Sequence, residues 1–383
     1  MSWPNTPSGI ADAIYAAGGD RSRVWFNGDR VYLLDFAIPA AASSAGSGRT
    51  IDARDYGLRQ SASASVNTAA IQEAFNAAKA SPRAKVFVPA GEYDYNGGIV
   101  WDRAISLEGD GRATVLNNIG AGTWGIRIQS PSSVIPYIVG VGEFAGLYMT
   151  GTSSGPAIEY DTESNWLLKS IHILGSAGVG IHIGRTQHAS VLTLDQVKIQ
   201  QCAKGVYGRG SAAKQINALN ISASDISGNN GTGVDVIASV MNIERSVVQG
   251  NAGFGVLLDP SDDIGSGSYS AYNVRILGNY LERNAAGELR IVTGVWPGGV
   301  TRTVNYLEVV GNLFAQGATA VCPAVTMTQD AGGAVANSLL SAGIRGGLWA
   351  NNNVTTETVG MDKMDFGNAL SDTFTILMSS DPS

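Results

Sequence analysis

The sequence predicts an all-β fold, a parallel β-helix in which a unit of three short strands repeats along the chain. Apolar residues recur at matching places in successive units of residues 168–321, each time beside a turn of small residues. Within the units apolar residues alternate with polar ones, as in Val197-Lys198-Ile199, which is strand periodicity and not helical periodicity. A unit this short can bury its apolar face only against its neighbours, so the units are expected to stack into one coil.

Three columns of aliphatic residues define the repeat. The column that follows the small-residue turn has steps of 25, 28, 22, 33 and 32 residues: Ile181, Val206, Val234, Val256, Leu289 and Val321. The column before the turn contains Ile173, Ile199, Ile226, Val248, Leu281 and Leu313. The third column, five residues earlier, contains Leu168, Leu194, Ile221, Ile243 and Ile276, and Glu308 ends it. Members of one column are predicted to touch inside the coil.

The turn itself repeats an asparagine. Asn229, Asn251 and Asn284 open the turn in three consecutive units. Stacked side-chain amides satisfy backbone groups that a tight turn leaves unpaired, so a ladder of these asparagines is predicted at one corner. The alternative is a β-sandwich with chance Asn-Gly turns. A sandwich does not need the same residue at one corner in coil after coil, and the β-helix is therefore preferred.

The composition agrees with this fold and disfavours several classes of partner. Of 383 residues, 49 are Gly and 15% are charged, which suits a turn-rich β structure and argues against disorder. The net charge of −7 disfavours a nucleic-acid partner, because such a surface needs clustered Lys and Arg. Cys202 and Cys322 make neither a disulfide framework nor a metal site and are interpreted as free thiols. No metal and no cofactor is predicted.

Targeting signals are not evident in the sequence. No apolar run is long enough to cross a membrane, and the first residues lack the basic and apolar regions of a secretory signal. We therefore expect a protein that is made in a cytoplasm and is not inserted into a membrane.

Residues 1–48 are predicted to form a small separate module with a linker. Ile10–Ala17 has the pattern of a short helix, and residues 24–34 contain two strand-like runs around Asn27-Gly28, a strong hairpin signal. A run of Ala, Ser and Gly then leads to Gly48 as a flexible connector. We interpret this part as an attachment module. The alternative is a loosely packed extension of the main domain.

Four segments that follow carry a family resemblance: residues 51–57, 67–75, 86–93 and 105–111. Together they resemble the opening segment of the pectate-lyase-like superfamily, to which phage tailspike-type proteins belong. The resemblance implies a right-handed parallel β-helix whose open end is covered by a capping α-helix. In this chain that helix has Asn67 as its predicted N-cap and Ile71, Phe75 and Ala78 on its buried face.

The chain departs from the family pattern just before this helix. The family has an acidic step there, where this sequence has residues 58–65 without an acidic residue. The prediction of the fold does not depend on that step. The β-helix is predicted to occupy residues 49–350, and residues 351–383 to cover the last coil or to form an oligomer contact.

Two long loops are the predicted functional site. The shortest coil takes 22 residues, whereas the steps from Val256 to Leu289 and from Leu289 to Val321 take 33 and 32. Two consecutive coils thus carry about ten extra residues each, in 259–272 and 293–306. Because both insertions fall between the same pair of strands, they are expected to project side by side and to wall a groove.

The content of these loops points to saccharide chemistry. One carboxyl group can donate a proton to the leaving oxygen while another acts as base or nucleophile, and aromatic faces can hold sugar rings. The predicted catalytic residues are Asp262, Asp263, Asp259 and Glu282, and the predicted substrate-binding residues are Trp296, Tyr269, Tyr272, Arg302 and Tyr306. Lower-ranked acids are Glu288, Asp225 and Asp235. The alternative interpretation of Asp259–Asp263 is a solvated turn.

The leading functional prediction is a phage tailspike-like receptor-binding protein that binds and depolymerises a bacterial surface polysaccharide, as a glycoside hydrolase or a polysaccharide lyase. The resemblance implies a homotrimer. The lack of a secretory signal and the module followed by a linker favour a protein of the virion tail, made in the host cytoplasm, whose N-terminal module contacts a tail component. One alternative is a free-standing, extracellular bacterial polysaccharide lyase or hydrolase. Another is a non-catalytic adhesive or structural β-helix.

Overall fold

The computed structural model of the chain describes residues 24–27, 30–33, 49–80, 84–129, 141–184, 188–209, 215–258, 269–296, 300–304, 306–316, 325–329, 347–350, 352–356, 364–365 and 374–377. The chain divides into two compact units, Met1–Gly48 and Arg49–Ser383. In the first unit, β1 (Val24–Asn27) and β2 (Arg30–Leu33) form an antiparallel hairpin with Asn27 opposite Arg30. The predicted hairpin is thereby confirmed, while the predicted helix at 10–17 lies outside the described residues.

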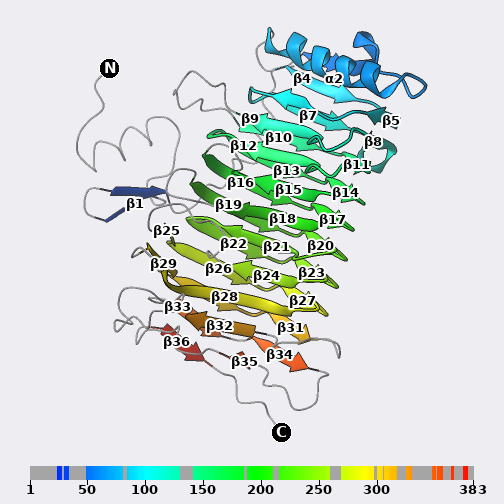
Figure 1. The fold of residues 1–383 in the computed structure, drawn as a ribbon. Coiled ribbons are helices and arrows are strands. Elements are labelled where there is room, and N and C mark those ends of the chain that lie inside the picture. Colours follow the sequence, from blue (N-terminus) through cyan, green and yellow to red (C-terminus); the bar gives the residue numbers. More distant parts are fainter. Residues whose placement is uncertain are drawn as a thin grey trace, which may run out of the picture. The chain divides into compact units, whose positions relative to one another are not determined.

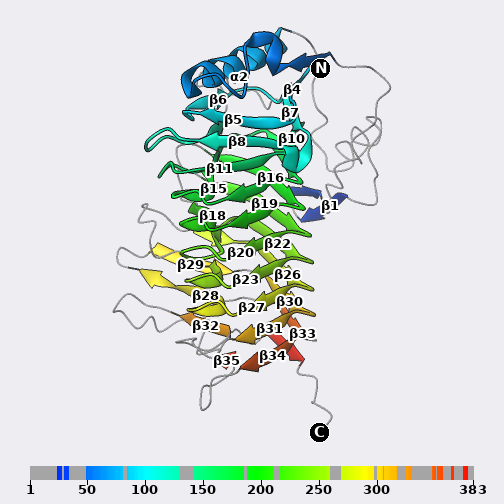
Figure 2. The same ribbon diagram turned by 90° about the vertical axis from the view of Figure 1, so that its right-hand side faces the viewer.

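Three sheets of parallel strands wind along the second unit, and each coil adds one strand to each sheet (Figures 1 and 2). The first sheet contains β3 (Thr50–Asp52), β4 (Lys85–Val88), β7 (Ser106–Gly109), β10 (Val141–Ala145), β13 (Asn165–Lys169), β16 (Ala189–Asp195), β19 (Ile216–Ser222), β22 (Val240–Glu244), β26 (Asn273–Leu277), β30 (Leu307–Val310), β33 (Gly347–Ala350) and β36 (Phe374–Leu377). The second sheet contains β5 (Gly91–Tyr95), β8 (Thr114–Asn118), β11 (Tyr148–Gly151), β14 (His172–Leu174), β17 (Lys198–Gln200), β20 (Asp225–Ser227), β23 (Val247–Gln249), β27 (Tyr280–Glu282), β31 (Leu313–Gln316) and β34 (Asn353–Thr356).

The third sheet closes each coil. It contains β6 (Ile99–Trp101), β9 (Ile126–Gln129), β12 (Ile158–Asp161), β15 (Val179–Ile183), β18 (Lys204–Arg209), β21 (Val234–Ile237), β24 (Phe254–Leu258), β28 (Gly287–Trp296), β29 (Val300–Val304) and β25 (Tyr269–Ala271). From β28 the wall continues through β32 (Val325–Gln329) to β35 (Met364–Asp365). This winding is the parallel β-helix that the sequence predicts.

The register of the strands confirms most of the predicted columns. Val234 pairs with Val256, which in turn pairs with Leu289, and all three side chains are buried. Each predicted column is wrong only at its C-terminal end, where the true members are Val325, Phe314 and Val309 instead of Val321, Leu313 and Glu308. The reason is that residues 316–321, which look like the earlier short turns, lie almost wholly within a longer connection of eight residues, 317–324.

The core lies inside the coil, where every second residue of a strand points. Near the N-terminal end it is filled by a chain of four aromatic rings: Phe75, Trp101, Phe144 and Trp166, whose successive centroids are 4.0, 5.3 and 5.0 Å apart. Further along, branched aliphatic residues take over, as in the Val234–Val256–Leu289 column. The two kinds of filling explain why aliphatic columns are visible in the sequence only beyond about residue 168.

The predicted asparagine ladder is present at the corner between the second and third sheets. Asn229 Nδ2 donates to Asn251 Oδ1 over 2.9 Å, and Asn251 Nδ2 donates to Asn284 Oδ1 over 2.8 Å. The same amides also donate to backbone carbonyls of the strands before the turn, so the corner leaves few polar groups unpaired.

A second ladder, which the sequence analysis does not predict, lies at the corner between the first and second sheets. Its members are Ser224, Ser246, Asn279, Asn312 and Asn352, and each member after Ser224 accepts a hydrogen bond from the backbone N–H of the member one coil before it. Its asparagines are also joined through their side chains, Asn279 to Asn312 and Asn312 to Asn352, over 2.9 Å in each case.

Helix α2 (Ala64–Lys79) packs on the first coil and covers its end, as predicted. Ile71, Phe75 and Ala78 are on its buried face. The predicted N-cap is wrong, because the helix begins one turn earlier with Ser63 at that position. Asn67 is instead a fully buried residue that accepts from Arg59 N and donates to the Asp94 carbonyl.

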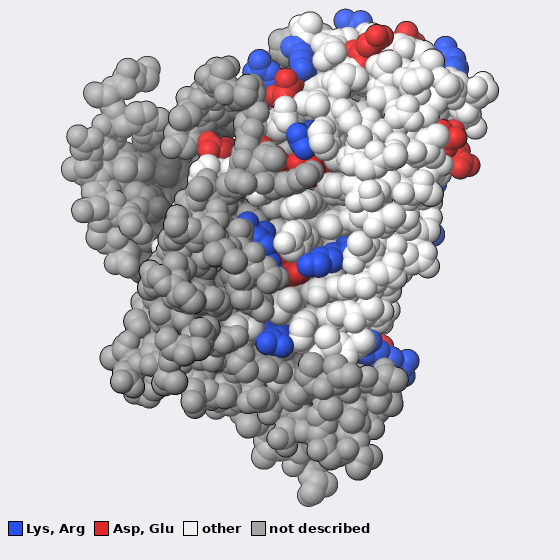
Figure 3. Space-filling view, viewed as in Figure 1, with Lys and Arg blue, Asp and Glu red and all other residues white. Residues whose placement is uncertain are grey.

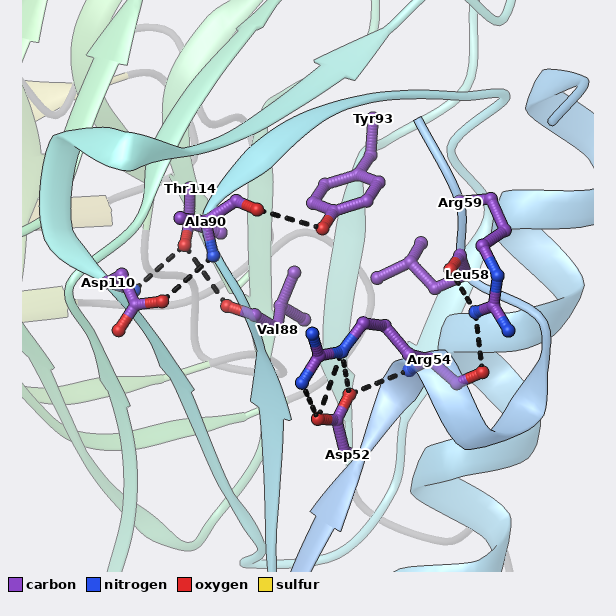
Figure 4. Close-up of polar contacts among 9 residues, drawn as sticks. All are labelled: Asp52, Arg54, Leu58, Arg59, Val88, Ala90, Tyr93, Asp110 and Thr114. Carbon is purple, nitrogen blue, oxygen red and sulfur yellow. Dashed lines mark hydrogen bonds and ion pairs between the residues drawn. The ribbon is translucent and has the colours of Figure 1, made fainter. Parts of the chain in front are cut away.

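The opening motif that carries the family resemblance forms a polar cluster (Figure 4). The Asp52 carboxylate accepts from the backbone N–H of Arg54 over 2.9 Å and from its guanidinium over 2.6 Å, which caps the 3-10 turn η2 (Ala53–Tyr56). Asp110, just before η3 (Gly111–Ala113), accepts from Ala90 N over 2.8 Å. Hydrogen bonds of Asp52 and Asp110 stabilise the turns of the first coils, so these residues have a structural role.

The described strands beyond residue 350 continue the coil. β34, β35 and β36 pair in parallel with β31, β32 and β33, one in each wall. The alternation in Phe374-Thr375-Ile376 has the same period as the earlier strands. The prediction that residues 351–383 cover the last coil or form an oligomer contact stays a prediction.

Candidate functional site

Connections from the third sheet to the first vary most in length. They range from two residues between β21 and β22 to seventeen between β32 and β33, with fourteen between β24 and β26. As predicted, the two long consecutive connections lie side by side, because β25 in one pairs in parallel with β29 in the other, with Tyr269 opposite Arg302.

The second of these connections is a hairpin, where the sequence predicts a loop. β28 is ten residues long, and its first part pairs with β24 and β32 in the wall. Its last part pairs antiparallel with β29, with Gly294 opposite Arg302 and Trp296 opposite Val300. The backbones of Tyr269, Arg302 and Trp296 are thereby held in one layer of paired strands.

Two of the predicted substrate-binding residues are exposed aromatic residues on neighbouring coils. Tyr272 is 57% exposed and Tyr306 is 43% exposed. Tyr272 immediately precedes β26 and Tyr306 immediately precedes β30, both strands of the first sheet. Their backbones are fixed by bonds to other coils, since Tyr272 N donates to Ser239 O and Val274 N donates to Tyr306 O. Among the described residues, the other large hydrophobic side chains that are similarly exposed are Val66, Ile119 and Val141, so Tyr272 and Tyr306 are the exposed aromatic residues of this group.

The predicted catalytic acids fall into two groups. Asp259, Asp262 and Asp263 lie outside the described residues. Glu282 is on β27 in the second sheet, beside Arg283 Nε at 3.4 Å, and its hydrogen bond to Tyr280 raises the pKa of that phenol. The structure therefore places Glu282 on a different wall from the two long connections.

The lower-ranked acids have structural partners. Glu288 is fully buried and ends the asparagine ladder, where Asn284 donates to both of its carboxylate oxygens. Burial raises the pKa of Glu288 to about 7. Asp225 forms an ion pair with Lys198 at 2.9 Å on the second sheet.

A carboxyl pair that the sequence analysis misses lies on the outer face of the third sheet. Glu159 and Asp161 are both buried on β12, and Glu159 forms an ion pair with Arg127 at 2.8 Å. Burial and a hydrogen bond with Asp161 raise the pKa of Glu159, against the opposing charge of Arg127. Adjacent carboxyl groups, one of them with a raised pKa, are a feature of acid–base sites. The signal in the sequence is the i, i+2 spacing, which puts both carboxyls on one face of a strand.

The family comparison covers this region and both long connections. The family described as "Right handed beta helix region" matches residues 156–355, about half of the chain. The chain belongs to this right-handed β-helix family. The predicted right-handed parallel β-helix is thereby confirmed. No curated protein is significantly similar to the chain in sequence.

Solved structures extend the likeness of this right-handed β-helix beyond the family match. The ORF18 protein of Geobacillus virus E2 is 13% identical with a TM-score of 0.53, over 81% of this chain and 62% of that one. The A-module of the mannuronan C-5 epimerase AlgE6 from Azotobacter vinelandii is 14% identical with a TM-score of 0.48, over 87% and 100%. Tailspike protein 3 of bacteriophage CBA120 is 14% identical with a TM-score of 0.32, over 85% and 62%. At these identities the likeness concerns the fold.

Within the described part of the β-helix, His, Cys, Asp and Glu residues do not gather in groups of three or more that could hold a metal ion. Among the described residues, no helix has the length and hydrophobicity that are needed to span a membrane.

Proposed function

We propose that the chain is a tailspike-like receptor-binding protein that binds and depolymerises a bacterial surface polysaccharide. The observation that carries the proposal is the exposure of Tyr272 and Tyr306 beside the paired long connections. Exposed, backbone-fixed aromatic rings on a rigid wall suit the apolar faces of sugar rings, which bind aromatic surfaces.

The proposed chemistry uses the acids of the first long connection. Asp262 and Asp263, with Asp259 near them in sequence, supply a proton donor and a base or nucleophile for cleavage of a glycosidic bond. Trp296, Tyr269 and Arg302 belong to the strand layer of the two long connections and contact the saccharide in this proposal. Glu282 takes no part in this step, because it lies on the second sheet.

Assembly and location complete the proposal. Three copies form a homotrimer, and the Met1–Gly48 unit attaches it to a component of the virion tail. The presence of a viral protein among the structures with the same fold is compatible with this location.

Retention of the protein on immobilised bacterial capsular and O-antigen polysaccharides tests the binding. Tyr272→Ala and Tyr306→Ala together are expected to weaken binding at least ten-fold, since each ring contributes about 1 kcal/mol or more. Tyr148→Ala is the matched control, because this tyrosine is on the second sheet, away from the long connections. Equal loss of binding in the control would contradict the proposed surface.

Release of oligosaccharides from the polysaccharide that is retained tests the chemistry. Asp262→Asn and Asp263→Asn are expected to abolish release while binding and the unfolding midpoint stay unchanged. Absorbance from an unsaturated sugar would identify a lyase, and its absence from the products a hydrolase. Binding without release by the unmodified protein would instead favour the adhesive alternative, and a monomer by light scattering the free-standing enzyme.

A further inference from the structure

A row of outward-facing side chains crosses six consecutive strands of the third sheet. The strand register places them side by side in the order Glu159, His182, Tyr207, Asp235, Leu257 and Arg290. Neighbouring strands are about 4.8 Å apart, so the row is roughly 24 Å long. The side chains of this row belong neither to the two asparagine ladders nor to the hydrophobic core of the coil.

The half of the row nearer the C-terminus has an excess of positive charge. Asp235 forms ion pairs with both Lys204 at 2.8 Å and Arg209 at 2.5 Å, so one carboxylate faces two cations. Arg290 adds a third cation two strands further along. Its Nε is buried and has no hydrogen-bond partner among the residues that the structure describes.

This excess is local, because the chain as a whole has a net charge of −7. On the face drawn in Figure 3, Lys and Arg side chains gather in the middle of the described surface, over β18 to β28, with an acidic side chain between them. A patch of positive potential on an acidic protein attracts anions selectively, because the surrounding surface repels them.

Aromatic rings hold these cations in place. Lys204 Nζ lies 4.2 Å and Arg209 Cζ 5.8 Å from the centroid of the Tyr207 ring, and the His182 ring is 5.1 Å from it. Arg290 Cζ lies 5.4 Å from the centroid of Phe254. The Tyr207 ring positions Lys204, whose side chain is 35% exposed, whereas Arg209 is buried against Asp235.

We propose that this basic–aromatic patch, which comprises Lys204, Tyr207, Arg209, Asp235 and Arg290, binds an anionic substituent of the polysaccharide, a carboxylate or a sulfate. The inference rests on the proposed function and narrows its ligand to an acidic glycan. Guanidinium and ammonium groups form their strongest hydrogen bonds with such oxyanions. Tyr207, which is half-buried, offers a ring surface to the adjoining sugar.

One strand joins the patch to the long connections. β28 carries Arg290 in the wall and ends at Trp296 in the hairpin. A polymer that follows this strand can contact both the patch and the long connections.

The test compares the full-length protein with a Lys204→Gln/Arg290→Gln variant on immobilised acidic and neutral bacterial polysaccharides. Asp235 still pairs with Arg209 in this variant, so the buried carboxylate keeps one cationic partner. Binding to acidic polymers is expected to weaken by about ten-fold or more, with a smaller dependence on salt.

A second variant, Lys198→Gln/Arg275→Gln, is the matched control. It removes the same charge from ion pairs on the other two walls, Lys198 with Asp225 and Arg275 with Glu308. Lys198 and Lys204 are on the same coil and are similarly exposed, 37% and 35%. The control is expected to bind as the unmodified protein does, and unfolding midpoints show that both variants are folded.

A third arm uses the retained acidic polymer after its carboxyl groups have been reduced to alcohols. The unmodified protein is expected to bind this neutral form about as weakly as the patch variant does. Equal binding of neutral and acidic polymers by both proteins would overturn the patch and leave the proposed function standing. Retention of no polysaccharide at all would overturn both. Retention of sulfated but not carboxylated polymers would identify sulfate as the anion.

Discussion

Asn251 is hydrogen-bonded through both polar atoms of its side chain. Its Oδ1 accepts from the backbone and side chain of Asn229, and its Nδ2 donates to Ile226 O and Asn284 Oδ1. Asn251→Ala therefore leaves several buried groups unpaired and is expected to reduce the free energy of unfolding by about 2–4 kcal/mol. Denaturant unfolding measures this loss. Asn230, the residue after Asn229, is exposed, and Asn230→Ala should change the free energy of unfolding by about 0.5 kcal/mol or less.

Glu288 makes the same ladder sensitive to pH. Its pKa of about 7 in the folded protein is above the ordinary value of 4.5, because burial disfavours the carboxylate. The protonated form is thus favoured by folding. The stabilisation that Glu288 contributes is fully present below about pH 4.5 and is lost as the pH rises through about 7, by roughly 3 kcal/mol in total.

Glu288→Gln should remove this dependence, which unfolding curves between pH 5 and pH 8 would measure. The glutamine amide places a donor against the Asn284 donor, so the variant is expected to be less stable at low pH. The slope with pH, and not the level, is therefore the readout. An unchanged slope would show that another group titrates there.

At the scale of the element, α2 completes the coil through polar contacts as well as apolar ones. Gln72 accepts from Val100 N and donates to Val100 O, over 2.9 and 3.0 Å, and so pairs both backbone groups on the free edge of β6. Thr68 accepts from Asn96 N in the same way. An uncovered edge strand would invite pairing with another chain.

Gln72→Leu is expected to lower stability by about 1–2 kcal/mol and to promote self-association, because the edge of β6 loses its partner. Sedimentation and unfolding curves measure the two effects. Glu73→Leu adds the same apolar side chain at an exposed neighbouring position. If both variants associate equally, added hydrophobicity and not the free edge is the cause.

At the scale of the molecule, the coil has its own core and its own cap. Residues Arg49–Ser383 form one compact unit and Met1–Gly48 another. Deletion of residues 1–48 is therefore expected to leave the unfolding midpoint of the coil and its polysaccharide binding unchanged. Light scattering of the shortened protein would also show whether the expected trimer depends on the N-terminal unit. Loss of binding would assign that unit a part in the site.

How much of the molecule could be predicted depended on whether residues repeat by type. The Asn229–Asn251–Asn284 ladder was predictable because one residue recurs. The second ladder changes from Ser246 to Asn279, and this hides it. The outer row of the third sheet is harder still, because each strand contributes a different side chain. The register after Leu289 failed because a longer connection contains a turn-like sequence, and sequence gives no length rule for such corners.

β28 belongs to the wall and to the hairpin at once. Its backbone pairing passes from β32 at Thr293 to β29 at Gly294 without an unpaired residue between them. The hairpin is therefore held rigidly where it leaves the wall. A ligand that binds to the hairpin does not have to order it first, so little conformational entropy of the chain is lost on binding.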